Sequence, residues 1–342
     1  MLYYSLDTDR GSVRERNEDS IAVVSRSNFL CLIVCDGMGG HDAGDLASQV
    51  AVEELQKYFS FDDPIEEGQE KSLLEEALQK ANDRINYVAM NKDHNGMGST
   101  VVVALLVKDG EQQRLTVAYA GDSRAYIFTV TPSGQSNILP LTKDHNVYND
   151  ATDPELVPVE ERGYLTQALG GGSTVQPTVN SSFNFPKDAV LLLCSDGLYE
   201  MLSTQEVLSI IAGKNVKQAS FALIQEANAR NSRDNVSVAI FQHGDSPLLL
   251  SKLFIATAEP FELGNEAPKN KKDQRSPNTE KRNAEKRNPP RSRQRHLAEK
   301  QDKRPNASNS KKKNQISSSA QKARSSRIKQ RENVFSKKQK IF

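Results

Sequence analysis

Three apolar, β-branched stretches of this chain each run directly into an aspartate that is followed by a turn-forming residue. The three junctions are Asp36-Gly37, Asp122-Ser123 and Asp196-Gly197. A fourth aspartate, Asp234, stands immediately before the apolar stretch 235–241. One Asp-Gly pair after a strand usually marks only a turn, but several such strand ends bring carboxylates together wherever the strands are neighbours.

Carboxylates held a few ångströms apart repel one another unless they are protonated or neutralised by a cation. No set of cysteines and histidines with metal-ligand spacing accompanies these aspartates, so the available donors are oxygen atoms. Oxygen donors favour hard ions such as Mg²⁺ or Mn²⁺ over zinc. The strand ends therefore predict a site for one of these ions.

The hydrophobic pattern of residues 1–243 predicts groups of strands with helices between them. Short β-branched runs predict strands at 20–25, 29–35, 100–107, 115–120, 125–129, 189–194 and 237–241. Apolar residues at a helical spacing predict helices at 42–59, 70–92 and 215–230. Helices that are separated from blocks of strands indicate an α+β fold built in layers.

The distribution of charge divides the chain near residue 268. Residues 1–268 hold 20 Lys and Arg against 38 Asp and Glu, while residues 269–342 hold 25 against 6, so an acidic body of net −18 precedes a basic tail of net +19. The tail has too few apolar residues to offset its ordering entropy. We expect a folded domain over 1–243, a linker or short amphipathic helix over 244–268, and a disordered basic tail over 269–342.

No segment has the length and apolar character of a membrane span, because charged residues and a proline interrupt the longest apolar stretch, 247–263. Acidic residues lie in the N-terminal stretch where a signal peptide has its apolar core. Cys31, Cys35 and Cys194 lie in apolar runs, which is typical of reduced core cysteines. These features indicate a cytoplasmic protein.

The segment 11–19 adds an arginine, Arg14, five residues before a further carboxylate, Asp19. The planar guanidinium of arginine matches two phosphate oxygens. Arg14 beside a metal site would therefore clamp a phosphoryl group. The alternative is a surface turn held by salt bridges, which the segment taken alone favours.

Eight segments, in order, resemble motifs of the metal-dependent protein phosphatases of the 2C class. They are RERNED (14–19), CDGMGGH (35–41), GMGST (96–100), GDSR (121–124), LTKDH (141–145), LTQALG (165–170), CSDGL (194–198) and SRDNV (232–236). The second motif resembles the bacterial branch of the family. The resemblance covers about 1–243 and implies a four-layer α/β/β/α sandwich, with two mainly antiparallel sheets flanked by helical pairs.

The resemblance also implies a centre of two Mn²⁺ or Mg²⁺ ions. The ligands that it implies are Asp19, Asp36, the Gly37 carbonyl, Asp196 and Asp234. Asp36 would bridge the two ions, with the Gly37 carbonyl on the first ion and Asp196 and Asp234 on the second. Asp122 together with Asp196 would form a weaker site for a third ion.

Other residues acquire roles around this centre through the same resemblance. Arg14 would bind the substrate phosphate and, with Asp36, carry the catalysis. Glu18 would hold metal-bound water, His41 would orient its glycine-rich loop, and Asn235 would support the neighbouring ligand.

Two features depart from the family pattern. Only 19 residues, 146–164, separate the LTKDH and LTQALG motifs, which is short for the flap beside the active site of bacterial members. Met38 stands where animal and plant members usually have a histidine, and a thioether cannot donate a proton. The proton for the leaving group would then come from metal-bound water or from another residue.

The expected activity is that of a Ser/Thr protein phosphatase, in which a hydroxide bridging the two ions attacks phosphorus without a phosphoenzyme. The expected partners are phosphoproteins, including a Ser/Thr kinase and its substrates, and the chain is expected to be a monomer. A metal-poor binding module is the alternative from another class. It is disfavoured because such a module has no need of three mutually repelling carboxylates.

The basic tail would target the enzyme to nucleic acid, acidic lipid or an acidic protein. Clusters such as 291–295 and 311–313 attract polyanions without sequence specificity. A solubilising or self-associating extension that folds back on the acidic body agrees equally well with the composition.

Overall fold

The computed structural model describes residues 2–39, 43–92, 94, 96–130, 136–172, 174–187 and 189–243. The predicted linker and tail, 244–268 and 269–342, lie outside the described residues, and so does His41. Among the helices of the described part, none combines the length and apolar character that a membrane crossing requires.

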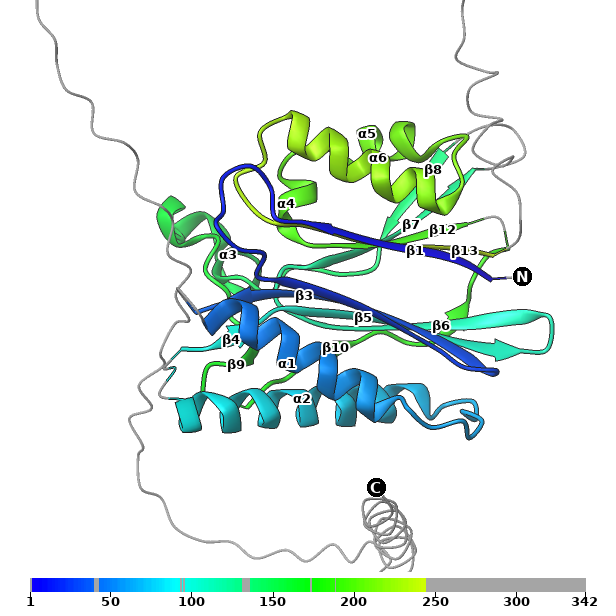
Figure 1. The fold of residues 1–342 in the computed structure, drawn as a ribbon, viewed down its shortest axis with the longest axis horizontal. Helices are drawn as coiled ribbons and strands as arrows, with labels where there is room; N and C mark the ends of the chain where they lie inside the picture. The colour runs from blue at the N-terminus through cyan, green and yellow to red at the C-terminus, as the bar shows by residue number, and fades with distance from the viewer. Residues whose placement is uncertain are drawn as a thin grey trace, which may run out of the picture. The chain divides into compact units, whose positions relative to one another are not determined.

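The described residues form two sheets in which all pairings are antiparallel (Figure 1). The first sheet contains, in spatial order, β1 (Leu2–Asp9), β13 (Val236–His243), β12 (Val190–Cys194), β7 (Arg124–Val130) and β8 (Ser136–Pro140). The second follows the order β10 (Thr178–Val179), β6 (Gln112–Ala120), β5 (Val101–Asp109), β3 (Phe29–Met38), β4 (Gly98–Ser99) and β9 (Leu169–Gly170). Two further strands, β2 (Asp19–Ser25) and β11 (Phe183–Asn184), pair with β3 and β6.

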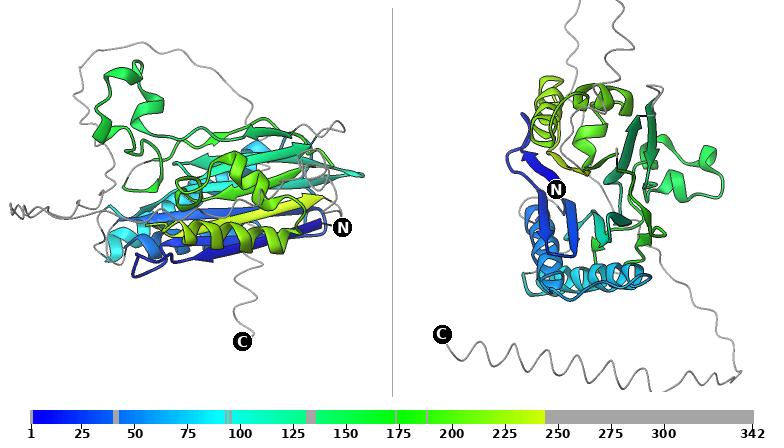
Figure 2. Two further views of the ribbon diagram at one scale, coloured as in Figure 1. Left: turned by 90° about the horizontal axis from the view of Figure 1, so that it is seen from above. Right: turned by 90° about the vertical axis from the view of Figure 1, so that its right-hand side faces the viewer.

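Helices cover the outer face of each sheet (Figure 2). The second sheet carries α1 (Ala43–Tyr58) and α2 (Glu70–Lys92), and the first carries α4 (Asp196–Tyr199), α5 (Thr204–Ile211) and α6 (Val216–Ala229). The segment 147–164, which we call the flap, contains α3 (Val147–Asp150) and the 3₁₀ turns Pro154–Leu156 and Val159–Glu161. The order of layers, helices, sheet, sheet and helices, confirms the α+β, four-layer α/β/β/α sandwich; the second sheet carries a pair of helices, and the first carries α5 and α6 together with the one-turn helix α4.

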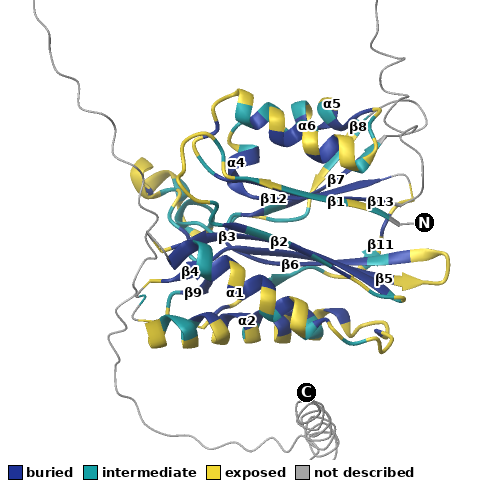
Figure 3. Cartoon of the chain, viewed as in Figure 1, coloured by how far each residue is buried: buried dark blue, intermediate teal, exposed yellow. Residues whose placement is uncertain are grey.

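Strand β3 shows why these layers form, because it is buried along its whole length (Figure 3). Phe29, Cys31 and Ile33 pack against the helices α1 and α2, while Leu30 and Leu32 pack between the two sheets. Successive side chains of a strand point to opposite faces. A continuous apolar run is therefore what a strand in the middle of a sandwich requires.

The seven predicted strands and three predicted helices are all present, with ends shifted by a few residues. The largest shifts are of three residues: β6 begins at Gln112 instead of Leu115, and β3 continues to Met38 instead of ending at Cys35, because Gly37 and Met38 pair with Ser99 and Gly98 of β4. Cys31, Cys35 and Cys194 are buried free cysteines, as predicted.

Candidate metal centre

Asp19 and Asp36 lie directly opposite each other on the neighbouring strands β2 and β3. Residues two apart in a strand lie on the same face. Asp19 therefore shares a face of β2 with Ile21, and Asp36 shares a face of β3 with Val34. Ile21 and Val34 both pack between the sheets. The two carboxylates therefore face the space between the sheets. Asp19 is 7% exposed and Asp36 is 5% exposed.

Asp122 and Asp196 lie just beyond the paired ends of β7 and β12. The ladder joins Arg124 to Cys194, so Asp122 lies two residues before this pair and Asp196, the first residue of α4, two residues after it. Asp234 lies two residues before β13, which is the other neighbour of β12. The four predicted strand ends thus lie at the same end of the sandwich.

A serine that the sequence analysis did not single out joins the two sheets at this point. Ser195 Oγ donates to Asp19 Oδ2 at 2.7 Å, and the Ser237 backbone N–H donates to Ser195 Oγ at 3.0 Å. Burial and then the charge of Asp36 raise the pKa of Asp19 well above its usual value, and the hydrogen bonds of Ser237 and Ser195 oppose that rise only in part. Asp19 thus prefers a proton or a cation beside it.

Arg14 lies at the entrance of this cluster and bonds to one of its carboxylates. Its Nη2 donates to Asp234 Oδ2 at 2.7 Å, and its Nη1 lies 3.7 Å from Glu18 Oε2. Burial, followed by the charge of Asp36, raises the pKa of Asp234, and the positive charge of Arg14 offsets part of this rise. Burial also raises the pKa of Glu18, with Arg14 again opposing. The salt-bridged turn is therefore present, and binding of phosphate by Arg14 stays a prediction.

Asn235 fixes the segment that carries Arg14. Its Oδ1 accepts from the Glu18 backbone N–H at 2.8 Å, and its Nδ2 donates to the carbonyl oxygens of Arg10 at 2.8 Å and Arg16 at 2.9 Å. The side chain is 2% exposed. Its amide thus ties the loop before β2 to the beginning of β13.

Gly37 allows α1 to begin very close to Asp36. A Cβ atom at this position would lie 2.0 Å from the Gly44 carbonyl oxygen and 2.6 Å from that of Glu18. The Gly37 backbone N–H donates to the same Glu18 carbonyl at 3.0 Å. No side chain fits here, and the backbone itself therefore lines the candidate centre.

The donor set fits hard divalent ions, because it consists of oxygen atoms: the buried carboxylates of Asp19, Asp36 and Asp196, the partly buried carboxylate of Asp234, and the Gly37 carbonyl. Burial and the charge of Asp36 raise the pKa of Asp19 and Asp234. Among the residues that the structure describes, no three His, Cys, Asp or Glu side chains already form a group arranged to hold a metal. In this structure the guanidinium of Arg14 pairs with one of the candidate carboxylates, that of Asp234.

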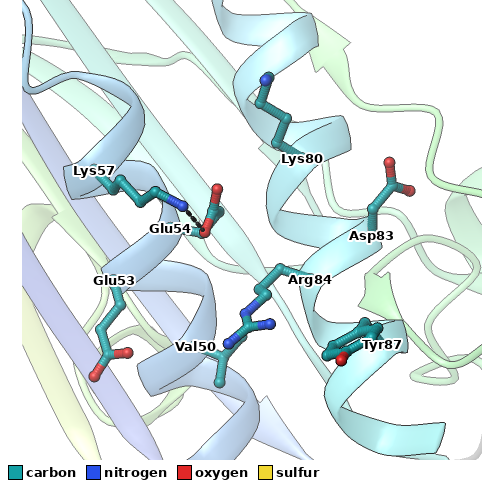
Figure 4. A pocket seen from close by; sticks show the side chains of 8 residues that line it. All are labelled: Val50, Glu53, Glu54, Lys57, Lys80, Asp83, Arg84 and Tyr87. Atoms are coloured by element: carbon teal, nitrogen blue, oxygen red, sulfur yellow. Dashed lines mark hydrogen bonds and ion pairs between the residues drawn. The ribbon is translucent and has the colours of Figure 1, made fainter. Parts of the chain in front are cut away.

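A groove lies between the solvent-facing sides of the helices α1 and α2 (Figure 4). Its volume is about 610 Å³, and none of the predicted site residues lines it. Lys57 pairs with Glu54 at 3.4 Å, and the guanidinium of Arg84 lies over the ring of Tyr87. We place the chemistry at the strand ends, because the groove lacks their cluster of buried carboxylates.

Comparisons with known proteins agree with the geometry. The family model "Protein phosphatase 2C" matches residues 13–151 and 171–236. A putative protein phosphatase 2C-type of Streptococcus pyogenes is 32% identical over 250 residues, which are 71% of this chain and 97% of the relative. The serine/threonine phosphatase stp of Listeria monocytogenes is 32% identical over 252 residues, 70% of this chain and 96% of the relative. The catalytic domain of the phosphatase PstP, solved in complex with two manganese ions, superposes with a TM-score of 0.58 at 31% identity, covering 71% of this chain and 99% of that one.

Proposed function

Since this chain belongs to the protein phosphatase 2C family, and is therefore a metal-dependent Ser/Thr protein phosphatase, we propose that the carboxylates at its strand ends hold two Mn²⁺ or Mg²⁺ ions. The observation that carries the proposal is the buried, directly opposed pair Asp19 and Asp36. Both members of such a pair can be ionised together only with a cation beside them. The two manganese ions in PstP support the same number here.

Asp36 would bridge the two ions, with the Gly37 carbonyl on the first and Asp196 and Asp234 on the second. Asp19 would complete the set, oriented by the hydrogen bond that it accepts from Ser195. Two metal ions held in this way would lower the pKa of bound water, so that a nucleophile is available near neutral pH. They would also stabilise the negative charge on the phosphate oxygens.

Arg14 would bind the phosphate of the substrate. Its side chain is 44% exposed, so the guanidinium can exchange Asp234 for an incoming phosphate without leaving its loop. Asn235 would hold that loop in place, and Glu18 would accept a hydrogen bond from bound water. The opposite charge of Arg14 and its fork of donors suit a phosphate dianion.

A third, weaker ion would lie between Asp122 and Asp196. The support is that both residues lie just beyond the paired ends of β7 and β12 and that the charge of Asp122 acts on Tyr199 of α4, the helix that begins at Asp196. His41 would orient the glycine-rich loop after Asp36.

The source of the proton for the leaving alcohol would be water or a residue other than Met38. The Met38 side chain packs against Leu165 and Ala168 and has no proton to give. The proposal that Met38 is not the general acid is therefore the same as the one drawn from the sequence.

The substrates would be phosphoserine and phosphothreonine proteins, among them a Ser/Thr kinase and its own substrates. The enzyme would be monomeric and cytoplasmic. Its basic segment 269–342, joined by 244–268 to the catalytic domain 1–243, would bind nucleic acid, acidic lipid or an acidic protein. Free buried cysteines agree with a reducing compartment.

The experiment is the release of inorganic phosphate from a phosphothreonine peptide by protein stripped of metal with EDTA. Mn²⁺ or Mg²⁺ should restore turnover better than Ca²⁺, because the larger, less acidic calcium ion lowers the pKa of water less. Equal turnover with and without chelator would exclude the metal-dependent mechanism.

A further inference from the structure

One guanidinium lies between the flap and the candidate metal centre. Arg124, the first residue of β7, donates from Nε to Asp144 Oδ1 at 2.8 Å and from Nη2 to Asp144 Oδ2 at 2.7 Å. Its Nη1 donates to the Tyr126 hydroxyl at 3.3 Å, and its Cζ lies 3.6 Å from the centroid of the Tyr199 ring. The fork, the third donor and the stacked face together fix the guanidinium plane.

Asp144 belongs to the base of the flap, residues 144–146 and 165–166, which we call the flap stem. The His145 backbone N–H donates to the Gly121 carbonyl at 3.0 Å, and the Thr166 backbone N–H donates to the His145 carbonyl at 3.0 Å. The flap stem is therefore bonded to the residue that precedes Asp122. Any movement of Asp144 would be transmitted to this loop through short backbone hydrogen bonds.

Tyr199 connects the same guanidinium to the other side of the centre. It is the last residue of α4, the one-turn helix that begins at Asp196. Burial, followed by the charges of Asp122 and Asp144, raises the pKa of Tyr199. The ring therefore lies within the field of Asp122 while its face packs on Arg124.

We infer that Arg124 is a positioning residue of the metal centre: its guanidinium holds the flap stem, which is bonded to the loop of Asp122, against α4, which begins at Asp196. The inference rests on the proposed function, since the carboxylates that it positions are proposed ligands. Lysine cannot replace Arg124, because an ammonium group keeps the charge but lacks both the planar fork and the stacking face.

The experiment compares full-length wild-type protein with the variant Arg124→Lys after removal of metal. Calorimetric titration with Mn²⁺ should show affinity reduced about tenfold, the size expected when the support of a metal ligand is lost. Before Mn²⁺ is added, hydrogen exchange should be faster at the His145 and Thr166 backbone amides and unchanged in β3.

The matched control is Arg114→Lys. Arg114 makes an equally short pair of contacts, with Glu70 Oε1 at 2.8 Å and Asp109 Oδ2 at 2.8 Å, and its side chain is 11% exposed. It lies on β6 opposite Val107, at the far end of the strands from the candidate centre. This variant should lower the melting temperature and leave both Mn²⁺ affinity and flap-stem exchange unchanged.

Asp144→Asn provides a second route to the same conclusion, and carries the test alone if Arg124→Lys does not fold. It should lower Mn²⁺ affinity and speed hydrogen exchange of the flap stem, as Arg124→Lys does. The double variant should bind Mn²⁺ no more weakly than the more affected single variant, because both changes break the same interaction.

Wild-type Mn²⁺ affinity and wild-type exchange in both variants, with only a lowered melting temperature, would overturn the inference. Wild-type protein that releases no phosphate with Mn²⁺ would instead refute the proposed function, while the exchange comparison would still test Arg124.

Discussion

Asp19 and Asp36 face each other from neighbouring strands, and both are nearly inaccessible to water. Like charges directly opposite each other weaken a sheet, and burial removes the screening that water provides. At the scale of single residues, this pair is a source of instability that a bound cation would relieve. Its presence in an otherwise apolar strand end is best explained by metal binding.

Asp19→Asn should therefore stabilise the metal-free protein in a pH-dependent way. The pKa of Asp19 is raised well above its ordinary 3.8, so between 3.8 and the raised value the folded state holds a proton that the unfolded state releases. Wild-type stability should fall as pH rises through that window and stay lowered above it. The variant, whose amide oxygen can still accept from Ser195, should show a smaller fall, because Asp234 and Glu18, whose pKa values are also raised, still contribute.

Melting temperatures measured in EDTA between pH 4 and pH 7 test this, with Asp62→Asn as the control. The Asp62 side chain is 83% exposed, so its loss should leave the pH dependence of wild type. Parallel curves for Asp19→Asn and wild type would show that Asp19 carries no strained charge.

Arg14→Ala should mainly raise the KM for a phosphopeptide, with a smaller fall in kcat. A side chain that holds the phosphate equally in ground and transition states contributes uniform binding. The melting temperature should change little, because a partly exposed ion pair contributes about 1 kcal/mol or less.

Arg16→Ala is the control for this variant, since Arg16 is 56% exposed, belongs to the same loop and pairs with Asp45 at 3.6 Å. It should leave KM unchanged. An unchanged KM for Arg14→Ala together with a lowered melting temperature would show that Arg14 only stabilises its turn through salt bridges and does not bind the phosphate.

At the scale of elements, the strands that pack on both faces were predictable from sequence, whereas the edge strands β1 and β8 were not predicted. β3, β5 and β12 are continuous apolar runs because helices cover one face and the other sheet covers the second. β1 alternates polar and apolar residues, and its partner β13 lies more than 200 residues away. A local pattern cannot reveal such a pairing.

The same limit applies to the candidate site. The strand-terminal aspartates were visible because each interrupts an apolar run, and the family motifs added Arg14 and Asp19. The bond between Ser195 and Asp19 spans 176 residues and joins two sheets, and the contact of Arg124 with Tyr199 spans the flap. These contacts depend on the packing of the layers, which the local pattern does not contain.

The helix α5 was missed although its sequence carries a start signal. Ser203 and Glu206 form a capping box, with the Ser203 backbone N–H donating to Glu206 Oε2 at 2.8 Å. Ser203→Ala should destabilise the protein by about 1 kcal/mol and leave phosphatase activity unchanged. Ser209→Ala, in the same helix but outside the cap, is the control for the thermal melt. Equal melting temperatures for the two variants would show that the cap adds no stability.

At the scale of the whole molecule, the acidic body and the basic tail should be separable. Deleting residues 269–342 removes a net charge of +19 and no part of the core clusters that the structure describes. The truncated protein should keep its melting temperature and its activity on a phosphopeptide, and lose salt-sensitive retention on heparin. Retention equal to that of the full chain would exclude the tail as the anchor, and unfolding would place the domain boundary elsewhere.

The central claim is that the carboxylates gathered at one end of the sandwich hold the ions on which catalysis depends. The most direct measurement is phosphate release from a phosphothreonine peptide by metal-stripped wild type and Asp36→Asn as Mn²⁺ is added, with melting temperature and Mn²⁺ binding recorded on the same samples. Wild type should gain activity, while Asp36→Asn should stay at least about 100-fold slower, bind Mn²⁺ more weakly, and melt at an equal or higher temperature. Turnover and Mn²⁺ affinity of Asp36→Asn equal to those of wild type would contradict the account.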